Sequence, residues 1–161
     1  MFNIFKKSKI TDSKVPKRIP IMRMEEYHTH YLGKTNDGKL FFGSETFANK
    51  KPHWEVKPEL LSQNRIEFAI LYLFDQKGKY LEHKYWSTEL DNERQNTNEK
   101  LEEMVAELGQ VIFCDIEVET FEISIDGIKC GLIPDEKSES IDLYPSNTIS
   151  FEEPWDGEYN T

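Results

Sequence analysis

The chain is poor in the residues that mark disulfide-stapled, membrane-spanning and secreted proteins. It holds two cysteines among 161 residues, which is too few for a disulfide framework. No apolar run approaches the roughly 20 residues that a membrane span requires. The N-terminal segment has neither the long apolar stretch nor the small-residue cleavage site of a secretory signal. We therefore expect a cytoplasmic protein.

Sequence motifs of catalysis and cofactor binding are also missing. The chain has no Gly-x-Ser-x-Gly nucleophile turn, no Gly-x-x-x-x-Gly-Lys or Gly-x-Gly-x-x-Gly phosphate loop and no EF-hand spacing. Cys114 lies in an apolar stretch and Cys130 precedes a glycine, so both are interpreted as small buried hydrophobic residues. The sequence predicts no cofactor and identifies no catalytic residue, and we favour a protein that is not an enzyme.

What the chain does have is aromatic residues and charge. Ten Phe, seven Tyr and three Trp argue against a disordered chain, and charged residues make up 31% of the sequence. A chain of this length is expected to form one domain around a single core. We expect one folded domain with a heavily charged surface.

The charge is unevenly distributed along the chain. Residues 1–18 contain six Lys or Arg against one acid, for a net charge of +5, whereas residues 19–161 carry −15. A body this negative repels the phosphate backbone, so we expect no nucleic-acid binding through the folded domain. A basic protein surface would be attracted to it and would associate faster at low salt.

The first 18 residues are predicted to form a basic flexible tail, followed by a single domain over residues 19–161. The tail has a second interpretation, which is weak contact with a membrane surface. Its apolar residues would enter the interface while its lysines meet anionic headgroups. The residues concerned are Phe2, Ile4, Phe5, Lys6, Lys7 and Lys9.

Patterning within the domain predicts strands joined by tight turns. Asp-Gly pairs at residues 37–38 and 126–127 indicate two hairpins, because Gly supplies the positive φ that such turns need. The apolar run Ile66–Phe74 indicates a central strand that is covered on both faces. The segment Asn49–Asn64 contains two prolines and is predicted to be a loop with a short helical turn.

One helix is predicted, over Asn96–Leu108. Its apolar residues recur at i, i+3, i+4 and i+7 and make one stripe along the helix, formed by Leu101, Met104, Val105 and Leu108. Asn96 is a candidate cap with Glu99 three residues on, and Gly109 provides a left-handed stop. Together the elements predict an α+β fold, a mostly antiparallel β-sheet with one main amphipathic helix packed on a face.

Two histidines, His28 and His30, form a candidate metal site. Residues two apart share a face of a strand, which would bring both imidazoles within reach of one ion. Further ligands would have to come from His53, His83 or distant carboxylates. The alternatives are ordinary strand histidines, or a small-molecule enzyme whose cleft holds His28 and His30 with nearby acids.

The C-terminal segment Glu152–Thr161 combines acids with two large aromatic residues. As a surface for a basic partner it would use its carboxylates for attraction and its aromatics as anchors. These candidate partner-binding residues are Glu152, Glu153, Trp155, Asp156, Glu158 and Tyr159. Pro154 and the Asp156-Gly157 pair are typical of turns, so the segment should also double back and press its aromatics onto the sheet as a structural plug.

Six motifs are spread over residues 18–161. They read Arg-Ile-Pro-Ile, Tyr-x-Thr-His-Tyr-Leu-Gly, Phe-Phe-Gly-Ser-Glu-Thr-Phe, Ala-Ile-Leu-Tyr-Leu-Phe-Asp-x-x-Gly, Ile-Asp-Gly-Ile-x-Cys-Gly-Leu-Ile-Pro and a closing Pro-Trp-Asp-Gly-Glu-Tyr-Asn-Thr. This set resembles a group of small bacterial proteins labelled formate hydrogenlyase regulatory protein. The resemblance implies a regulator of transcription. Because the acidic body has no helix-turn-helix pattern or basic stripe, such regulation would work by binding a protein.

The sequence therefore predicts a cytoplasmic, non-enzymatic binding or regulatory domain that meets a basic protein partner through its acidic surface. One alternative is an immunity-type protein that neutralises a toxin, because strong negative charge speeds the capture of a basic enzyme. The other is the small-molecule enzyme with a His28/His30 site.

Overall fold

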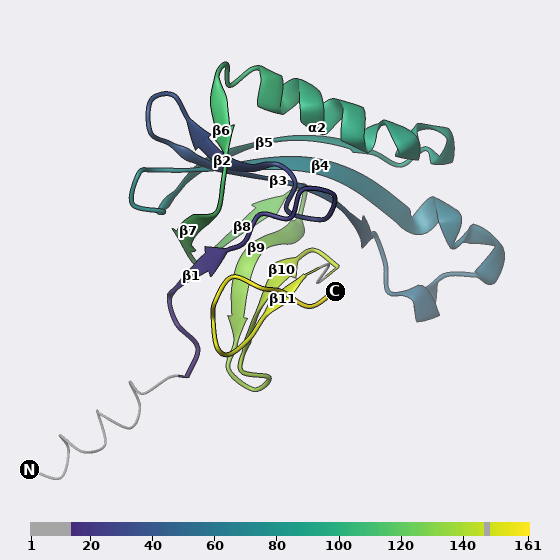
Figure 1. Cartoon of the computed structure of the whole chain (residues 1–161). Coiled ribbons are helices and arrows are strands. Elements are labelled where there is room, and N and C mark those ends of the chain that lie inside the picture. The colour runs from purple at the N-terminus through teal and green to yellow at the C-terminus, as the bar shows by residue number, and fades with distance from the viewer. Residues whose placement is uncertain (1–13, 147–148) are drawn as a thin grey trace, which may run out of the picture.

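The computed structural model describes residues 14–146 and 149–161, and they form three layers (Figure 1). Helix α2 (Thr97–Ala106) covers one face of a five-stranded antiparallel sheet, and a four-stranded antiparallel sheet lies on the opposite side. The α+β class is confirmed. The strands divide among three sheets, however, where the sequence had indicated only one.

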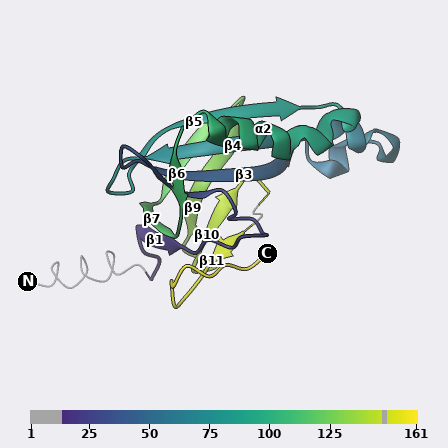
Figure 2. The same cartoon turned by 45° about the horizontal axis from the view of Figure 1, so that its top comes forward.

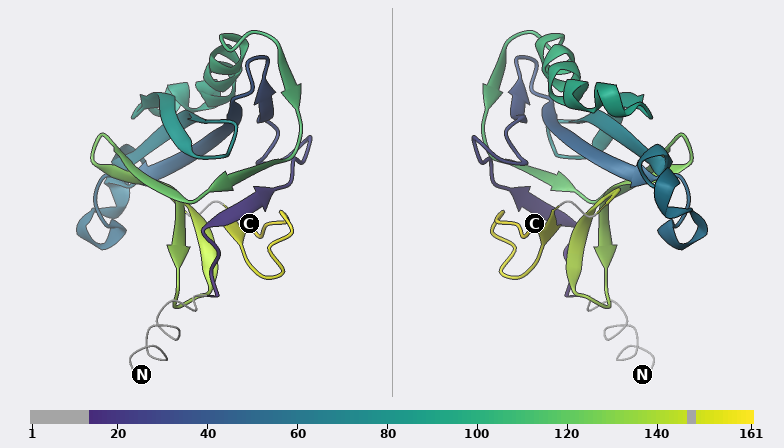
Figure 3. Two further views of the ribbon diagram at one scale, coloured as in Figure 1. Left: turned by 90° about the vertical axis from the view of Figure 1, so that its left-hand side faces the viewer. Right: turned by 90° about the vertical axis from the view of Figure 1, so that its right-hand side faces the viewer.

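The five-stranded sheet has the strand order β5-β4-β3-β2-β6, and the four-stranded sheet has the order β11-β10-β9-β8. The strands of the first are β2 (Leu32–Thr35), β3 (Leu40–Asn49), β4 (Arg65–Phe74), β5 (Tyr80–Thr88) and β6 (Val111–Phe113). Those of the second are β8 (Phe121–Ile125), β9 (Ile128–Asp135), β10 (Ser140–Tyr144) and β11 (Ser150–Phe151). A ribbon of β1 (Arg18–Ile21) and β7 (Ile116–Glu119) lies between the two sheets (Figure 3).

Strand β4 is the central element, as its apolar run predicted. Residues on one face of it pack in the main core, between the two large sheets, and those on the other face pack under α2. The main-core face carries Phe68, Ile70, Tyr72 and Phe74, and the helix face carries Ala69, Leu71 and Leu73. Because successive side chains of a strand point to opposite faces, a continuous apolar run is what such double coverage requires.

Helix α2 runs along β3, β4 and β5 (Figure 2). Its predicted apolar stripe is buried at Leu101, Met104 and Val105. The helix ends shortly before Gly109, whose φ is +83°. The predicted cap is wrong, because the Asn96 side chain makes no capping hydrogen bond. A 3-10 helix, η4 (Asp91–Asn96), leads directly into α2 instead.

Both predicted hairpins are present. In the β8–β9 hairpin Ile125 pairs with Ile128 and Ile123 pairs with Cys130, across a turn in which Gly127 has a φ of +80°. Cys130 is buried and both cysteines are free thiols, with burial raising the Cys130 pKa to about 11. The predicted loop contains three single 3-10 turns: η1 (His53–Glu55), η2 (Pro58–Leu60) and η3 (Ser62–Asn64).

Most of the predicted flexible tail, and the apolar residues and lysines of its predicted membrane contact, lie outside the described residues. Within the described part, Val15 is buried in the main core and β1 begins at Arg18. Residues 14–146 and 149–161 contain no helix long and apolar enough to cross a membrane.

Candidate functional site

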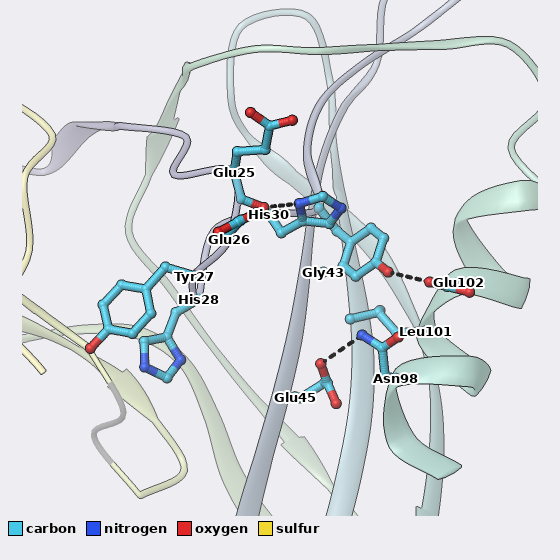
Figure 4. A pocket seen from close by; sticks show the side chains of 11 residues that line it. Glu25, Glu26, Tyr27, His28, His30, Gly43, Glu45, Asn98, Leu101 and Glu102 are labelled. Carbon is cyan, nitrogen blue, oxygen red and sulfur yellow. Dashed lines mark hydrogen bonds between the residues drawn. The ribbon is translucent and has the colours of Figure 1, made fainter. Parts of the chain in front are cut away.

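A half-open cavity of about 470 Å³ lies between the segment 25–31, strand β3 and helix α2 (Figure 4). This volume is in the range of small-ligand sites. We call it the acidic pocket. Its lining residues are Glu25, Glu26, Tyr27, His28, His30, Tyr31, Gly43, Glu45, Asn98, Leu101 and Glu102. Four of these residues are acids and none of them is Lys or Arg.

The segment before β2 is a series of turns, and the hydroxyl of Thr29 fixes its shape. Thr29 is fully buried; its Oγ1 accepts a hydrogen bond from the Met24 backbone N at 2.8 Å and donates one to the Met22 backbone O at 2.7 Å. These bonds draw the chain back on itself, so the extended conformation predicted for this segment is wrong. His28 and His30 do not share a strand face, and their rings project from different parts of the turn (Figure 4).

The two histidines do not form a metal cluster with other ligands. Among residues 14–146 and 149–161, no three His, Cys, Asp or Glu side chains come together as a metal site. His53 lies in η1 and His83 lies on β5, and neither lines the acidic pocket.

The helix side of the pocket is held by hydrogen bonds to two carboxylates. Tyr31 Oη donates to Glu102 Oε1 at 3.0 Å, and Asn98 Nδ2 donates to Glu45 Oε2 at 3.1 Å. The other oxygen of Glu45 accepts from Thr97 Oγ1 at 2.7 Å. Burial, followed by the bond to Glu102, raises the pKa of Tyr31 to about 12. Tyr31 therefore stays protonated at neutral pH and remains a hydrogen-bond donor to Glu102.

On the turn side, His30 is oriented by backbone groups. Its Nδ1 is hydrogen-bonded to the Glu25 backbone O and also lies 3.4 Å from Nη2 of Arg23. Arg23 Nε donates to the His30 backbone O at 2.8 Å, while its guanidinium lies 4.6 Å from the centre of the Phe113 ring. The His30 ring meets Tyr31 edge to face, with 4.5 Å between ring centres.

The C-terminal segment forms the structural plug that was predicted, and it supports the outer wall of the pocket. Tyr159 stacks on Tyr27 with 6.1 Å between ring centres, and its hydroxyl lies 3.0 Å from Thr29 Oγ1. Tyr27 Oη is 2.9 Å from Thr161 Oγ1. The backbone N of Met22 donates to the Gly157 backbone O at 3.0 Å. The segment doubles back as expected.

The six predicted partner-binding residues divide by exposure. Trp155 and Tyr159 are half-buried against the main core. The four acids of the set are exposed, namely Glu152, Glu153, Asp156 and Glu158. The contact between Tyr27 and Tyr159 brings the C-terminal segment next to the acidic pocket. The two regions are neighbours although they lie at opposite ends of the domain's sequence.

Sequence reasoning missed the β3 and α2 side of the pocket. Glu45 is the one charged residue in the apolar stretch of β3, and Asn98 and Glu102 are four apart on α2, which puts them on one side of the helix. Those signals were present. What the sequence did not contain was the pairing of that helix side with the turn before β2.

The arrangement is better suited to binding than to acid-base chemistry. No hydrogen bond or ion pair joins His28 or His30 to a carboxylate within the pocket lining, although a general base normally acts with such an orienting partner. Glu45 and Glu102 accept bonds from neutral donors, which leaves their negative charge uncompensated within the lining. No family model, curated protein or solved structure matches the chain.

Proposed function

We propose that this chain is a cytoplasmic, non-enzymatic binding or regulatory domain whose acidic surface meets a basic protein partner, and that the acidic pocket receives a cationic side chain of that partner. The observation that carries the proposal is the lining of the pocket, in which four carboxylates stand without a Lys or Arg. Residues 19–161 carry a net charge of −15, which would speed the approach of a basic partner.

The shape of the pocket supports a lysine or arginine side chain as its occupant. The aromatic rings of Tyr27 and Tyr31 line it beside the acids, and a cation over a tyrosine ring gains about 0.5–2 kcal/mol. The C-terminal segment, whose four acids are exposed, contacts the pocket lining where Tyr159 stacks on Tyr27. A partner anchored in the pocket would lie against these acids.

The resemblance to proteins labelled as regulators fits this proposal, with regulation exerted through a bound protein. Capture of a toxin by an immunity-type protein would be one form of it. The genes that neighbour this one distinguish the forms, because a toxin gene next to it would identify the partner.

A second candidate function is catalysis on a small molecule. The observation in its favour is that the pocket gathers His28, His30 and four carboxylates in one cavity. The substrate would be cationic for the reason given above. Catalysis would require His30 Nε2 or the His28 ring to move a proton, so turnover would fall sharply in a His28→Gln/His30→Gln variant, whereas protein binding would depend on the carboxylates.

Affinity capture from cells of the source organism tests the proposal. The bait is the full chain, compared with a Glu25→Gln/Glu26→Gln/Glu102→Gln variant, in which each glutamine keeps an oxygen acceptor but loses the charge. The matched control is Glu55→Gln/Glu59→Gln/Glu122→Gln, which removes the same charge from exposed positions outside the pocket lining. We expect a basic protein that the chain and the control retain, that the pocket variant loses, and that high salt releases. Equal retention by all three baits contradicts the proposal.

A further inference from the structure

Strand β5 (Tyr80–Thr88) is an edge strand of nine residues. It pairs with β4 on one side, and the part of the chain that the structure describes places no strand on the other. The outer edge of β5 is seen in Figure 2, where β5 is the last strand of the helix-covered sheet. Such an edge presents a row of unpaired backbone donors and acceptors, which is a template for another strand.

Side-chain contacts fix the position of β5 through the two faces of the sheet. On the helix face, Lys84 Nζ lies 3.7 Å from Glu107 Oε2 of the segment after α2. On the main-core face, Tyr85 Oη donates to the Asp126 carboxylate at 3.0 Å. Strand β5 is therefore fixed in position from both faces, as a strand that accepts a partner without rearrangement should be.

The order of charges along β5 points to a second copy of the chain as the partner. Glu82 and Lys84 both lie on the helix face, opposite Leu73 and Leu71 of β4, with His83 between them on the other face. When two identical strands pair antiparallel about a two-fold axis perpendicular to the sheet, the residue at the axis lies opposite its own copy. Residues at equal distances on either side of it then lie opposite each other, with their side chains on the same side of the sheet.

We propose that two copies of this chain associate through antiparallel pairing of their β5 strands, centred on His83. In this register Glu82 of each copy faces Lys84 of the other, which gives two cross-strand pairs of opposite charge. Regular pairing in this register spans Glu82–Lys84, because Leu81, which would face Tyr85, lies at the bulge where the β4–β5 register shifts.

The neighbouring registers are excluded by charge. A pair centred on Glu82 would oppose Glu82 to itself, and a pair centred on Lys84 would oppose Lys84 to itself; like charges directly opposite destabilise a sheet. A centre on Tyr85 pairs Lys84 with Trp86 and leaves both charges without a partner. The sequence Glu-His-Lys at residues 82–84 therefore selects the register centred on His83. The complementary charges of Glu82 and Lys84 in this register favour a second copy of the chain over an unrelated strand as the partner.

Sedimentation equilibrium of the full chain, from micromolar to millimolar concentration, tests the proposal. We expect the wild-type mass to rise with concentration to twice that of the single chain. The variants Glu82→Lys and Lys84→Glu each place like charges opposite each other twice, and should weaken association by roughly tenfold or more, which corresponds to about 1.4 kcal/mol. The double variant Glu82→Lys/Lys84→Glu exchanges the two charges and should restore it.

Two further measurements make the result decisive. Lys57→Glu/Glu59→Lys, which exchanges charges at two exposed positions at the start of η2, should associate like the wild type. Thermal melts followed by circular dichroism verify that each variant is folded, as expected for changes at exposed or half-exposed positions. A wild-type chain that stays monomeric at millimolar concentration overturns the proposal. So does a dimer that the single substitutions leave intact, or one that the double exchange fails to restore.

Discussion

The hydroxyl group of Tyr159 lies 3.0 Å from Oγ1 of Thr29, across 130 residues of sequence. Thr29 shapes the turn that forms one wall of the acidic pocket, and Tyr159 belongs to the C-terminal plug. This contact joins the last segment of the chain to the candidate site. The plug is thus a support of the pocket as well as a cover for the main core.

The first prediction concerns this contact. In Tyr159→Phe the ring remains against the main core, while the bond to Thr29 is lost, so we expect a loss of about 1 kcal/mol in the free energy of unfolding. Deletion of residues 155–161 also removes the packing of Trp155 and the bond between Met22 and Gly157, and should lower the melting temperature by several degrees. Calorimetry measures both. An unchanged melt after the deletion would show that the segment is not a structural plug.

The second prediction concerns the space between β3 and α2. A Cβ atom at Gly43 would lie 2.9 Å from Leu101 Cδ1, closer than real Cβ atoms approach, and 3.0 Å from Tyr31 Cβ, which is an unusually tight contact. Gly43→Ala should therefore push the helix from the sheet and destabilise the protein by about 1–3 kcal/mol. Leu101→Val removes the Cδ1 atom, so the double variant should lose less than the sum of the two single changes. Strictly additive losses in denaturant titrations would contradict the close contact.

The third prediction concerns the pH dependence of stability. Burial lowers the pKa of His83 below its ordinary value of 6.5, and the nearby Glu82 partly offsets this. Because the folded state binds the proton more weakly than the unfolded state, the contribution of His83 is fully present above pH 6.5 and is lost as the pH falls through the folded pKa. His83→Gln should flatten the fall in melting temperature below this pH, with His53→Gln in the exposed loop as the control. Identical slopes for His83→Gln and the wild type would refute the assignment.

The sequence predicted the elements whose signals are local. The period of Leu101, Met104 and Val105 identifies the helix stripe, and the Asp-Gly pair before Ile128 identifies the second hairpin. These patterns work because a helix or a tight turn is decided by residues a few positions apart.

The wall of the acidic pocket depends on contacts between distant segments. Thr29 looks like a strand residue in sequence, since β-branched side chains favour strands. In the structure its hydroxyl bonds the backbone of Met22 and Met24 and reaches Tyr159 from the other end of the chain. No periodic pattern encodes such bonds. For the same reason Glu45 and Glu102 could be seen as acids but not as members of one cavity with His30.

The central claim is that the acidic pocket binds a cationic group. The most direct test is a titration of the isotopically labelled full chain with a short lysine-rich peptide, followed through backbone amide NMR signals at low and high salt. We expect the largest shifts at residues of the pocket lining, among them Tyr27, His30, Gly43 and Asn98, with affinity that weakens as salt is added. Glu25→Gln/Glu26→Gln/Glu102→Gln should abolish these shifts. Shifts that spread over the acidic surface without favouring the pocket, or an equal response to a glutamate-rich peptide, would contradict the account.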